Sequence, residues 1–220
     1  MTQPSPKGRF ITFEGPEGSG KSTQVRRLAS RLRQHGREVL VTREPGGTPT
    51  CEAIRGILQH DKTGEAIGPA AELLLFEASR AQLVAQVIAP ALLQGAWVVC
   101  DRFADSTTAY QGYGRGFELL TVQQLNGVAV QGCVPDLTIL LDVPVESGFE
   151  RLKGRPATGK AGHDRIERES RDFHERVRAG YLQLAKRWPE RIRMIDGLRA
   201  EDVIAEDIWK VVAHALGPLG

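Results

Sequence analysis

The chain has 220 residues, 41% hydrophobic and 25% charged, so it is long enough to bury one core and short enough for a single domain. Its formal net charge of +2 is too small for a protein that coats nucleic acid, and no stretch approaches the roughly 18 uninterrupted apolar residues of a membrane span. We therefore expect a globular protein that binds small acidic ligands, with neither nucleic acid nor a membrane as a partner.

The first eight residues are polar, contain two prolines and lack the apolar segment of a signal peptide. We interpret residues 1–8 as a loose tail and residues 9–220 as a single domain. The three cysteines, Cys51, Cys100 and Cys133, are odd in number and lack metal-ligand spacing, which favours neither disulfides nor a zinc site. A reducing cytoplasm is the expected location.

Short apolar runs and helical patterns alternate along the chain. The apolar runs predict buried strands at residues 9–14, 38–42, 97–101, 137–142 and 191–196. Helical spacing predicts helices at residues 21–35, 50–60, 69–94, 121–132, 145–154, 166–188 and 200–216. This alternation predicts an α/β fold with a five-stranded, mostly parallel sheet flanked by helices on both faces.

The predicted helix at residues 69–94 is unusually apolar. Its hydrophobic residues cover more of the circumference than a one-sided surface helix would show. Two interpretations remain open: a central core helix, or one half of an oligomer interface.

A glycine-rich loop lies between the first predicted strand and the first predicted helix, which is the context of a P-loop. Glycines let backbone N–H groups approach phosphates closely, and the helix presents its positive end. Lys21 is expected to reach the β- and γ-phosphates, and the Ser22 hydroxyl to bind Mg²⁺. The motif predicts a nucleoside triphosphate ligand without fixing the reaction. Its residues are Gly15, Pro16, Glu17, Gly18, Ser19, Gly20, Lys21 and Ser22, followed by Thr23.

The third predicted strand ends in Asp101 and is followed by Arg102. A carboxylate at this point is where a P-loop enzyme orders Mg²⁺, so Asp101 is the second metal-binding candidate. The alternative is an ordinary aspartate that opens a turn. Arg102 suits bidentate capture of a phosphate, or a surface ion pair.

Two features favour a kinase over a regulatory GTPase. The guanine-reading Asn-Lys-x-Asp segment is absent, and Leu141-Asp142-Val143-Pro144 occupies the corresponding strand end. Residues 151–165 are basic and glycine-rich, as expected of a short lid that closes over the donor and excludes water. The alternative for residues 151–165 is a solvated charged loop.

Together, five blocks in register resemble the thymidylate kinase family of P-loop nucleoside monophosphate kinases, over nearly the whole chain. The resemblance implies an enzyme that transfers the γ-phosphate of ATP, with Mg²⁺, to dTMP, and that forms a homodimer through residues 69–94. The blocks are Thr42-Arg43-Glu44-Pro45-Gly46-Gly47-Thr48, Leu75-Phe76-Glu77-Ala78-Ser79-Arg80, Asp101-Arg102-Phe103 followed by Ser106-Thr107-Thr108-Ala109-Tyr110-Gln111-Gly112, Pro135-Asp136-Leu137-Thr138, and Asp164-Arg165-Ile166-Glu167.

The resemblance also implies how the thymine base is bound. Phe76 matches an aromatic residue that stacks on the base, and Arg80, four residues later, matches an arginine that donates to its carbonyl edge. Gln111 and Thr108 match residues at the N3 and O4 edge that also crowd a ribose 2′-hydroxyl. The alternatives are a core aromatic at position 76, and residues that cap or line a turn at 108 and 111.

The phosphates are expected to meet a set of charged residues. Arg102, Arg43 and Arg55 match positions that hold the acceptor monophosphate, although Arg55 also fits an exposed helix face. Glu14 matches an acidic position near the acceptor phosphate and the metal. Some family members carry an arginine in the P-loop where this chain has Glu17, so the lid must supply that positive charge. The residues assigned to catalysis are Lys21, Arg102, Arg155, Arg165 and Glu14.

Two other functions stay open at this point. A kinase for another nucleoside monophosphate would lack the edge-reading pair Arg80 and Gln111. A non-catalytic nucleotide-binding module would bind without turnover, although Lys21, Ser22 and Asp101 are all present.

Overall fold

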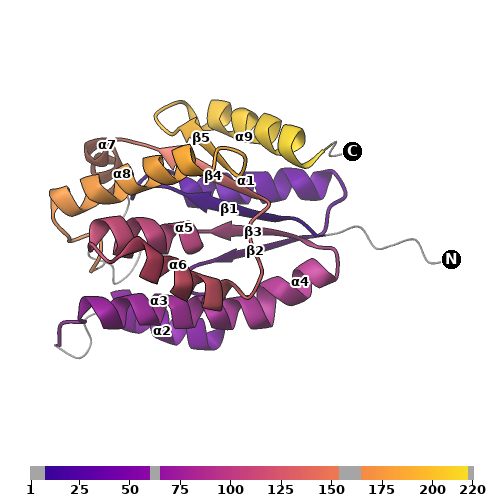
Figure 1. The fold of residues 1–220 in the computed structure, drawn as a ribbon. Helices are drawn as coiled ribbons and strands as arrows, with labels where there is room; N and C mark the ends of the chain where they lie inside the picture. Colours follow the sequence, from indigo (N-terminus) through magenta and orange to yellow (C-terminus); the bar gives the residue numbers. More distant parts are fainter. Residues whose placement is uncertain (1–7, 60–64, 154–164, 218–220) are drawn as a thin grey trace.

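The protein folds around a five-stranded sheet in which all neighbouring strands are parallel and the order is β2-β3-β1-β4-β5 (Figure 1). The computed structural model describes residues 8–59, 65–153 and 165–217. The predicted α/β class and the five-stranded sheet are confirmed. The strands are β1 (Phe10–Glu14), β2 (Val39–Arg43), β3 (Trp97–Asp101), β4 (Leu137–Asp142) and β5 (Ile192–Asp196).

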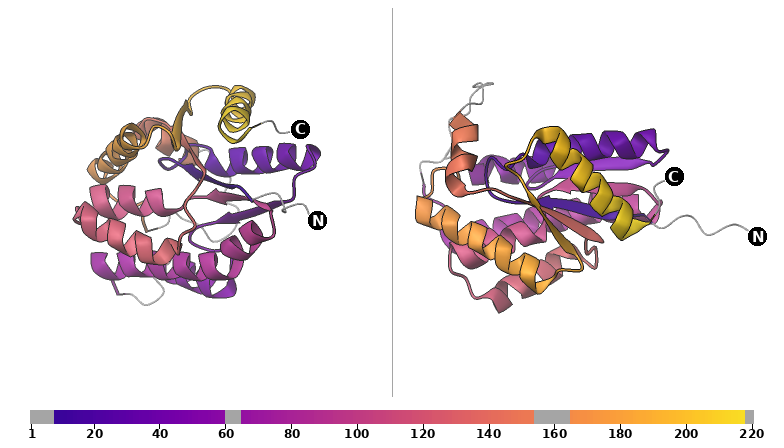
Figure 2. Two further views of the ribbon diagram at one scale, coloured as in Figure 1. Left: turned by 45° about the vertical axis from the view of Figure 1, so that its right-hand side comes forward. Right: turned by 90° about the horizontal axis from the view of Figure 1, so that it is seen from above.

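Helices cover both faces of the sheet (Figure 1). On one face, α1 (Lys21–Gln34) and α9 (Glu201–Leu216) lie side by side and share a hydrophobic cluster with β1 and β4 (Figure 2). The remaining helices are α2 (Pro49–Gln59), α3 (Pro69–Leu83), α4 (Ala89–Leu93), α5 (Ala104–Thr107), α6 (Leu119–Val130), α7 (Val145–Lys153) and α8 (Arg171–Arg187), with π-helical segments η1 (Val84–Ile88) and η2 (Thr108–Gly114).

The sheet brings the two acidic strand ends close together. All five residues of β1 are buried, because a central parallel strand is covered on both faces. The register of β1 and β3 pairs Phe13 with Asp101, so Glu14 and Asp101 end at the same edge of the sheet. Ligands of open α/β sheets bind at this carboxyl edge, where the order of the strands reverses.

The helix predicted at residues 69–94 is interrupted. It consists of α3, one π-helical stretch over Val84–Ile88, and α4, with Pro90 at the start of α4. Leu83, Val84 and Ile88 are fully buried, so this part of the helix belongs to the core. The uniform apolar pattern gave no sign of the wider turn, because packing rather than helix propensity stabilises a π-helical segment.

The sequence prediction missed α5 and η2, and it started α8 too early. The segment that forms η2 is rich in glycine, which is a poor helix former, and it packs against α8. A Cβ atom on Gly114 would meet the Phe173 ring at 2.7 Å, so this glycine permits the close packing. In α8, Ser170 is the N-cap and accepts from the Phe173 N–H, so the helix starts at Arg171 rather than at 166.

Within the described ranges, each helix is too short or too polar to span a bilayer.

Candidate functional site

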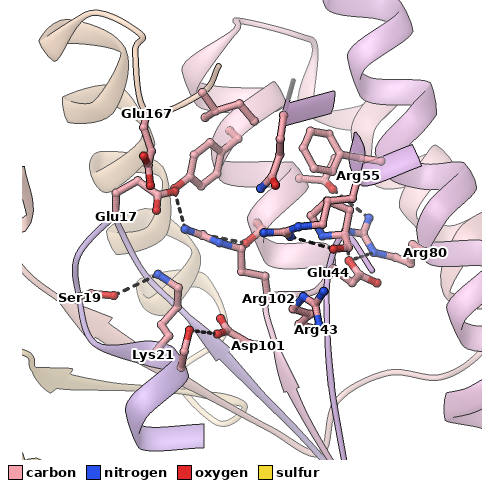
Figure 3. Close-up of a pocket in the computed structure, with 18 of the residues that line it drawn as sticks. Glu17, Ser19, Lys21, Arg43, Glu44, Arg55, Arg80, Asp101, Arg102 and Glu167 are labelled. Atoms are coloured by element: carbon pink, nitrogen blue, oxygen red, sulfur yellow. Dashed lines mark hydrogen bonds and ion pairs between the residues drawn. The ribbon is translucent and has the colours of Figure 1, made fainter. Parts of the chain in front are cut away.

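A cavity of about 230 Å³ opens at the carboxyl edge of β1 and β3 (Figure 3). Lys21 and Asp101 lie at one end, Arg80 and Glu44 lie at the other, and Arg102 lies between them (Figure 3). Most of the predicted site residues line this cavity. They are Glu17, Gly18, Ser19, Gly20, Lys21, Ser22, Arg43, Arg55, Phe76, Arg80, Asp101, Arg102 and Gln111.

The glycine-rich loop adopts a backbone that other residues would strain. Gly15, Gly18 and Gly20 have φ values of 143°, 69° and 90°, in a region that L-residues avoid. A Cβ atom on Gly18 would lie 2.1 Å from the Gly148 carbonyl oxygen, so glycine at position 18 also lets α7 pack directly on the loop. The loop ends at α1, whose first N–H groups point to the end where an anion binds.

Lys21 is folded back into this loop. Its Nζ donates to the Gly15 carbonyl at 2.9 Å, to the Pro16 carbonyl at 2.8 Å and to Ser19 Oγ at 3.1 Å. Burial and, after it, the nearby Arg102 guanidinium together lower the pKa of Lys21 to about 8. The ammonium therefore has only neutral acceptors, and an anion at the loop would stabilise its charge.

Asp101 and Ser22 meet at the mouth of the loop. Ser22 Oγ donates to Asp101 Oδ2 at 2.5 Å, and both residues line the cavity. A hydroxyl and a carboxylate form a hard oxygen pair of the kind that Mg²⁺ binds together with phosphate oxygens and water. The two predicted metal ligands, which are distant in sequence, are thus adjacent in space.

Arg102 connects the glycine-rich loop to the rest of the cavity. It has φ of 70°, which is rare for a residue other than glycine and directs the side chain across the cavity. Its guanidinium donates to Glu17 Oε1 at 2.6 Å and to the Gly15 carbonyl at 3.1 Å. Burial works to raise the pKa of Glu17, but Arg102 and Lys21 outweigh burial and hold that pKa at about 2. Arg102 also lies over the Tyr110 ring, 5.1 Å from its centroid.

Glu14 lies directly behind this arginine and is fully buried. Its carboxylate accepts from the Phe103 N–H at 2.8 Å, from Ser106 Oγ at 2.6 Å and from the Tyr181 hydroxyl at 3.1 Å. Burial and the charge of Asp105 nevertheless raise the pKa of Glu14 to about 7. Glu14 supports the cavity floor and does not line the cavity itself.

Arg80 is the most heavily hydrogen-bonded residue at the other end of the cavity. It is 1% exposed and donates to Glu44, Glu77, Thr107 and Asn126 at 2.6–2.9 Å. Burial raises the pKa of Glu44 to about 7. The effect of burial outweighs the attraction of the Arg80 guanidinium, which also donates to Glu77. Sequence reasoning missed these two carboxylates, although a buried arginine always requires such acceptors.

Arg43 and Arg55 line the cavity from β2 and α2. Arg43 NH2 donates to Glu52 Oε1 at 2.8 Å, and Arg55 NH1 donates to the Pro45 carbonyl at 2.9 Å. With Lys21, Arg80 and Arg102 these arginines surround the cavity with positive charge, which suits an anionic ligand. Phe76 supplies an aromatic ring to the lining and lies one helical turn before Arg80 on α3.

The other predicted residues lie outside the cavity lining. The Thr108 side chain points into the protein interior, where its Oγ1 donates to the Ala104 carbonyl at 3.3 Å and accepts from Asn126 Nδ2 at 3.2 Å. The neighbouring residue, Thr107, lines the cavity instead. Arg165 donates to Glu72 Oε2 at 2.5 Å and to the Leu58 carbonyl at 3.1 Å. Gly15 and Pro16 belong to the glycine-rich loop and Thr23 to the first turn of α1, and none of the three lines the cavity. Arg155 and most of the predicted lid fall outside the described residues.

The pattern missed several polar residues that hold the site together. Tyr110 donates to Glu17 Oε1 at 2.7 Å, and Tyr181 and Ser106 share a hydrogen bond of 2.8 Å behind Arg102. The signal for Ser106 and Tyr110 was present, because both stand in the family-like block that follows Asp101. Nothing in the local sequence marked Tyr181, which reaches the site only through the packing of α8.

Known proteins with a similar sequence cover almost the whole chain. A sequence model of the family described as thymidylate kinase matches residues 13–208. The thymidylate kinase of Syntrophotalea carbinolica is 50% identical over 94% of this chain and 96% of its own length, and that of Geobacter sulfurreducens is 53% identical over 94% and 97%. The crystal structure of thymidylate kinase from Ehrlichia chaffeensis superimposes with a TM-score of 0.74 at 34% identity, covering 94% of this chain and 99% of that one.

Proposed function

The chain belongs to the thymidylate kinase family, and we propose that it transfers the γ-phosphoryl group of ATP to dTMP, with Mg²⁺, to give ADP and dTDP. The observation that carries this proposal is the single cavity that joins a P-loop to a cationic pocket with an aromatic ring. The protein is a nucleoside monophosphate kinase, and the geometry supports a role for each end of its cavity.

At the donor end, the loop backbone and Lys21 bind the triphosphate. Lys21 exchanges its three neutral acceptors for phosphate oxygens, and the incoming negative charge favours the ammonium form. Ser22 and Asp101 are the residues that would hold Mg²⁺, which supplies charge neutralisation to the phosphates when bound. Glu17 does not bind phosphate through its carboxylate; it fixes Arg102 at the point of transfer.

At the acceptor end, the arginines and Phe76 bind dTMP. Arg102, Arg43 and Arg55 hold the monophosphate, and Phe76 stacks on the base. The acceptor oxygen is already anionic, so the enzyme needs positioning and charge neutralisation rather than a general base. Glu14 supports Arg102 from behind through Ser106 and Tyr181.

The base edge is read by Arg80 and Gln111, while Thr108 acts from behind through Asn126. The lid supplies the remaining positive charge at transfer. Arg155 is its first candidate, and Arg165 takes part only if it leaves the Glu72 carboxylate that holds it in this structure.

A panel of acceptors tests the proposal. Purified protein is incubated with ATP, Mg²⁺ and each of dTMP, dUMP, dCMP, dGMP and AMP, and ADP release and the new diphosphate are followed, with Lys21→Ala as the control. We expect dTMP to react best and the control to be inactive. A different preferred acceptor would remove the roles of Phe76, Arg80 and Gln111, and ATP binding without turnover would refute the kinase function.

The residues of α3 also support a homodimer as a proposal. Leu74 on α3 is 56% exposed, and α2 and α6, which flank α3, expose Ile57 by 50% and Val128 by 76%. Three exposed aliphatic side chains on neighbouring helices are typical of a covered interface. Leu74→Glu is expected to shift the sedimentation coefficient from dimer to monomer.

The three unpaired cysteines support the reducing cytoplasm as the location.

A further inference from the structure

Glu72 is a buried carboxylate that the proposed mechanism leaves unused. It lies in the first turn of α3 and is 1% exposed. Its Oε1 accepts from Gln111 Nε2 at 2.9 Å and from Arg115 Nε at 3.0 Å, and its Oε2 accepts from NH2 of Arg115 at 2.9 Å and of Arg165 at 2.5 Å. In all four hydrogen bonds the Glu72 carboxylate is the acceptor. This one anion therefore links α3 to Gln111, Arg115 and Arg165, which lie far from it in the sequence.

The charge of Glu72 is secured by these contacts. Burial works to raise its pKa, but the hydrogen bonds from Arg115, Gln111 and Arg165 outweigh burial and hold the pKa below its ordinary value. An ionised carboxylate can only accept hydrogen bonds. The group of Gln111 that faces Glu72 must therefore be the amide NH₂.

This fixed amide determines what Gln111 presents to the cavity. Gln111 is 1% exposed and lines the cavity, and its nitrogen is directed to Glu72. The other atom of the same planar amide, Oε1, is then the one available to a ligand, and it is an acceptor only. Turning the amide over would set its oxygen against the Glu72 carboxylate, leaving two buried acceptors face to face.

We propose that Glu72 is a positioning residue for base selection: it locks the Gln111 carbonyl toward the cavity, so that the site accepts pyrimidines with an N3–H donor and rejects cytosine. Thymine and uracil carry a hydrogen on N3, whereas N3 of cytosine is an acceptor and would face the Gln111 oxygen. The inference rests on the proposed function, because it assumes that a pyrimidine monophosphate occupies the acceptor end.

Glu72→Gln tests this role. The new amide must place its nitrogen at one of the two oxygen positions. The Oε2 position faces two guanidinium nitrogens, of Arg115 and Arg165, and neither can become an acceptor. The Oε1 position faces one guanidinium nitrogen, Arg115 Nε, and the Gln111 amide, which can turn over and accept. The nitrogen therefore goes to the Oε1 position, opposite Gln111. Gln111 then turns over, and its NH₂ faces the cavity, where it matches N3 of cytosine.

The readout is a pair of selectivity ratios in kcat/KM. We expect the dTMP to dCMP ratio of Glu72→Gln to fall by about 10- to 100-fold, the size of one mispaired buried hydrogen bond. The dTMP to dUMP ratio must stay within about threefold of the wild-type ratio, since both bases carry N3–H. A loss of activity that is equal for all acceptors would show a merely structural role and overturn the proposal.

Arg115→Gln is the matched control. It removes one positive charge from Glu72 and leaves the Gln111 contact in place. We expect lower stability and an unchanged dTMP to dCMP ratio. If this ratio falls as far as in Glu72→Gln, the selection comes from the charge cluster and not from the amide.

The unaltered protein provides a test that does not depend on a folded Glu72 variant. The NMR resonances of the Gln111 side-chain NH₂ are assigned by their loss in Gln111→Leu. We expect these protons to exchange with solvent at least about tenfold more slowly than those of an exposed glutamine side chain, both before and after dTMP is added. Rapid exchange of these protons would overturn the proposal. Failure of wild-type protein to phosphorylate dTMP would instead refute the proposed function, while slowed exchange would still support the locked amide.

Discussion

The two ends of the cavity are built in different ways. The donor end is built mainly from residues 17–22, a continuous stretch of the glycine-rich loop and the first turn of α1, to which β3 adds Asp101. The acceptor end collects side chains from β2, α2, α3 and η2, and its charges are buried in pairs around Arg80 and Glu72. A local loop is encoded in local sequence, whereas a pocket of paired charges depends on how distant elements pack.

This contrast predicts different costs for the loss of a charge. Lys21 donates its hydrogen bonds to neutral oxygens only, and Glu17, whose pKa it helps to lower, keeps its contact with Arg102. The removal of Lys21 therefore leaves no buried ion without a partner. Arg80 serves two buried carboxylates, so its removal leaves both without their cation. At the donor end a lost charge should therefore affect activity alone, and at the acceptor end it should affect stability as well.

Lys21→Met is the change with the largest expected effect at the donor end. We expect kcat/KM to fall by about 10³-fold or more, because the group that neutralises the transferring phosphates is lost. The free energy of unfolding, measured with urea, should stay within about 1 kcal/mol of wild type or rise, since an apolar side chain replaces a buried ammonium. A large loss of stability would mean that the two ends do not differ in this respect.

Arg80→Met should unfold the acceptor end. We expect the free energy of unfolding to fall by about 3–5 kcal/mol, because Glu44 and Glu77 lose the cation they share. Urea denaturation followed by circular dichroism measures the change. Arg171→Met, which breaks an ion pair with Glu146 whose side chains are 63% and 61% exposed, is the control and should cost less than about 1 kcal/mol. Equal losses in the two variants would contradict the model of buried paired charges.

Gly18→Ala and Gly20→Ala separate backbone strain from crowding in the loop. Both positions have positive φ, so both variants pay about 1 kcal/mol of strain. Only the Cβ at position 18 meets another backbone atom, the Gly148 oxygen at 2.1 Å, whereas nothing lies within 4 Å at position 20. We expect Gly18→Ala to lose about 1–3 kcal/mol more in thermal unfolding and to raise the KM for ATP further. The reverse order would show that α7 does not pack on the loop as described.

The pH dependence of ATP use gives the smallest and most specific effect. Burial is the main cause that lowers the pKa of Lys21 from its ordinary value of 10.5 to about 8, so the ammonium loses its proton within a measurable range. Below pH 8 the free enzyme carries the charge, and above it kcat/KM for ATP should fall by about tenfold per pH unit. In kcat at saturating ATP the decline should begin at higher pH, because bound phosphates favour the ammonium. A kcat/KM profile that stays flat to pH 10 would contradict this role of the lysine.

Much of the fold could be predicted because its signals are local. The strands at residues 97–101 and 137–142 have the predicted bounds, since buried parallel strands leave continuous apolar runs that end at turn residues. The segment 108–114 could not be predicted as helical, because Gly112 and Gly114 are poor helix formers and the packing of α8 supplies what propensity lacks. The same dependence on packing explains the π-helical stretch within residues 69–94.

The sequence alone determined the glycine loop, the carboxylate at the end of β3 and the family blocks, because each lies within a few consecutive residues whose spacing is fixed by the chain. Only the tertiary structure decided that Arg80 is held by Glu44, that Arg165 contacts Glu72, and that Tyr181 reaches Arg102. These partners are 36 to 93 residues apart. The pairing of buried charges is a property of the packed interior, where an arginine without its carboxylate would not be stable.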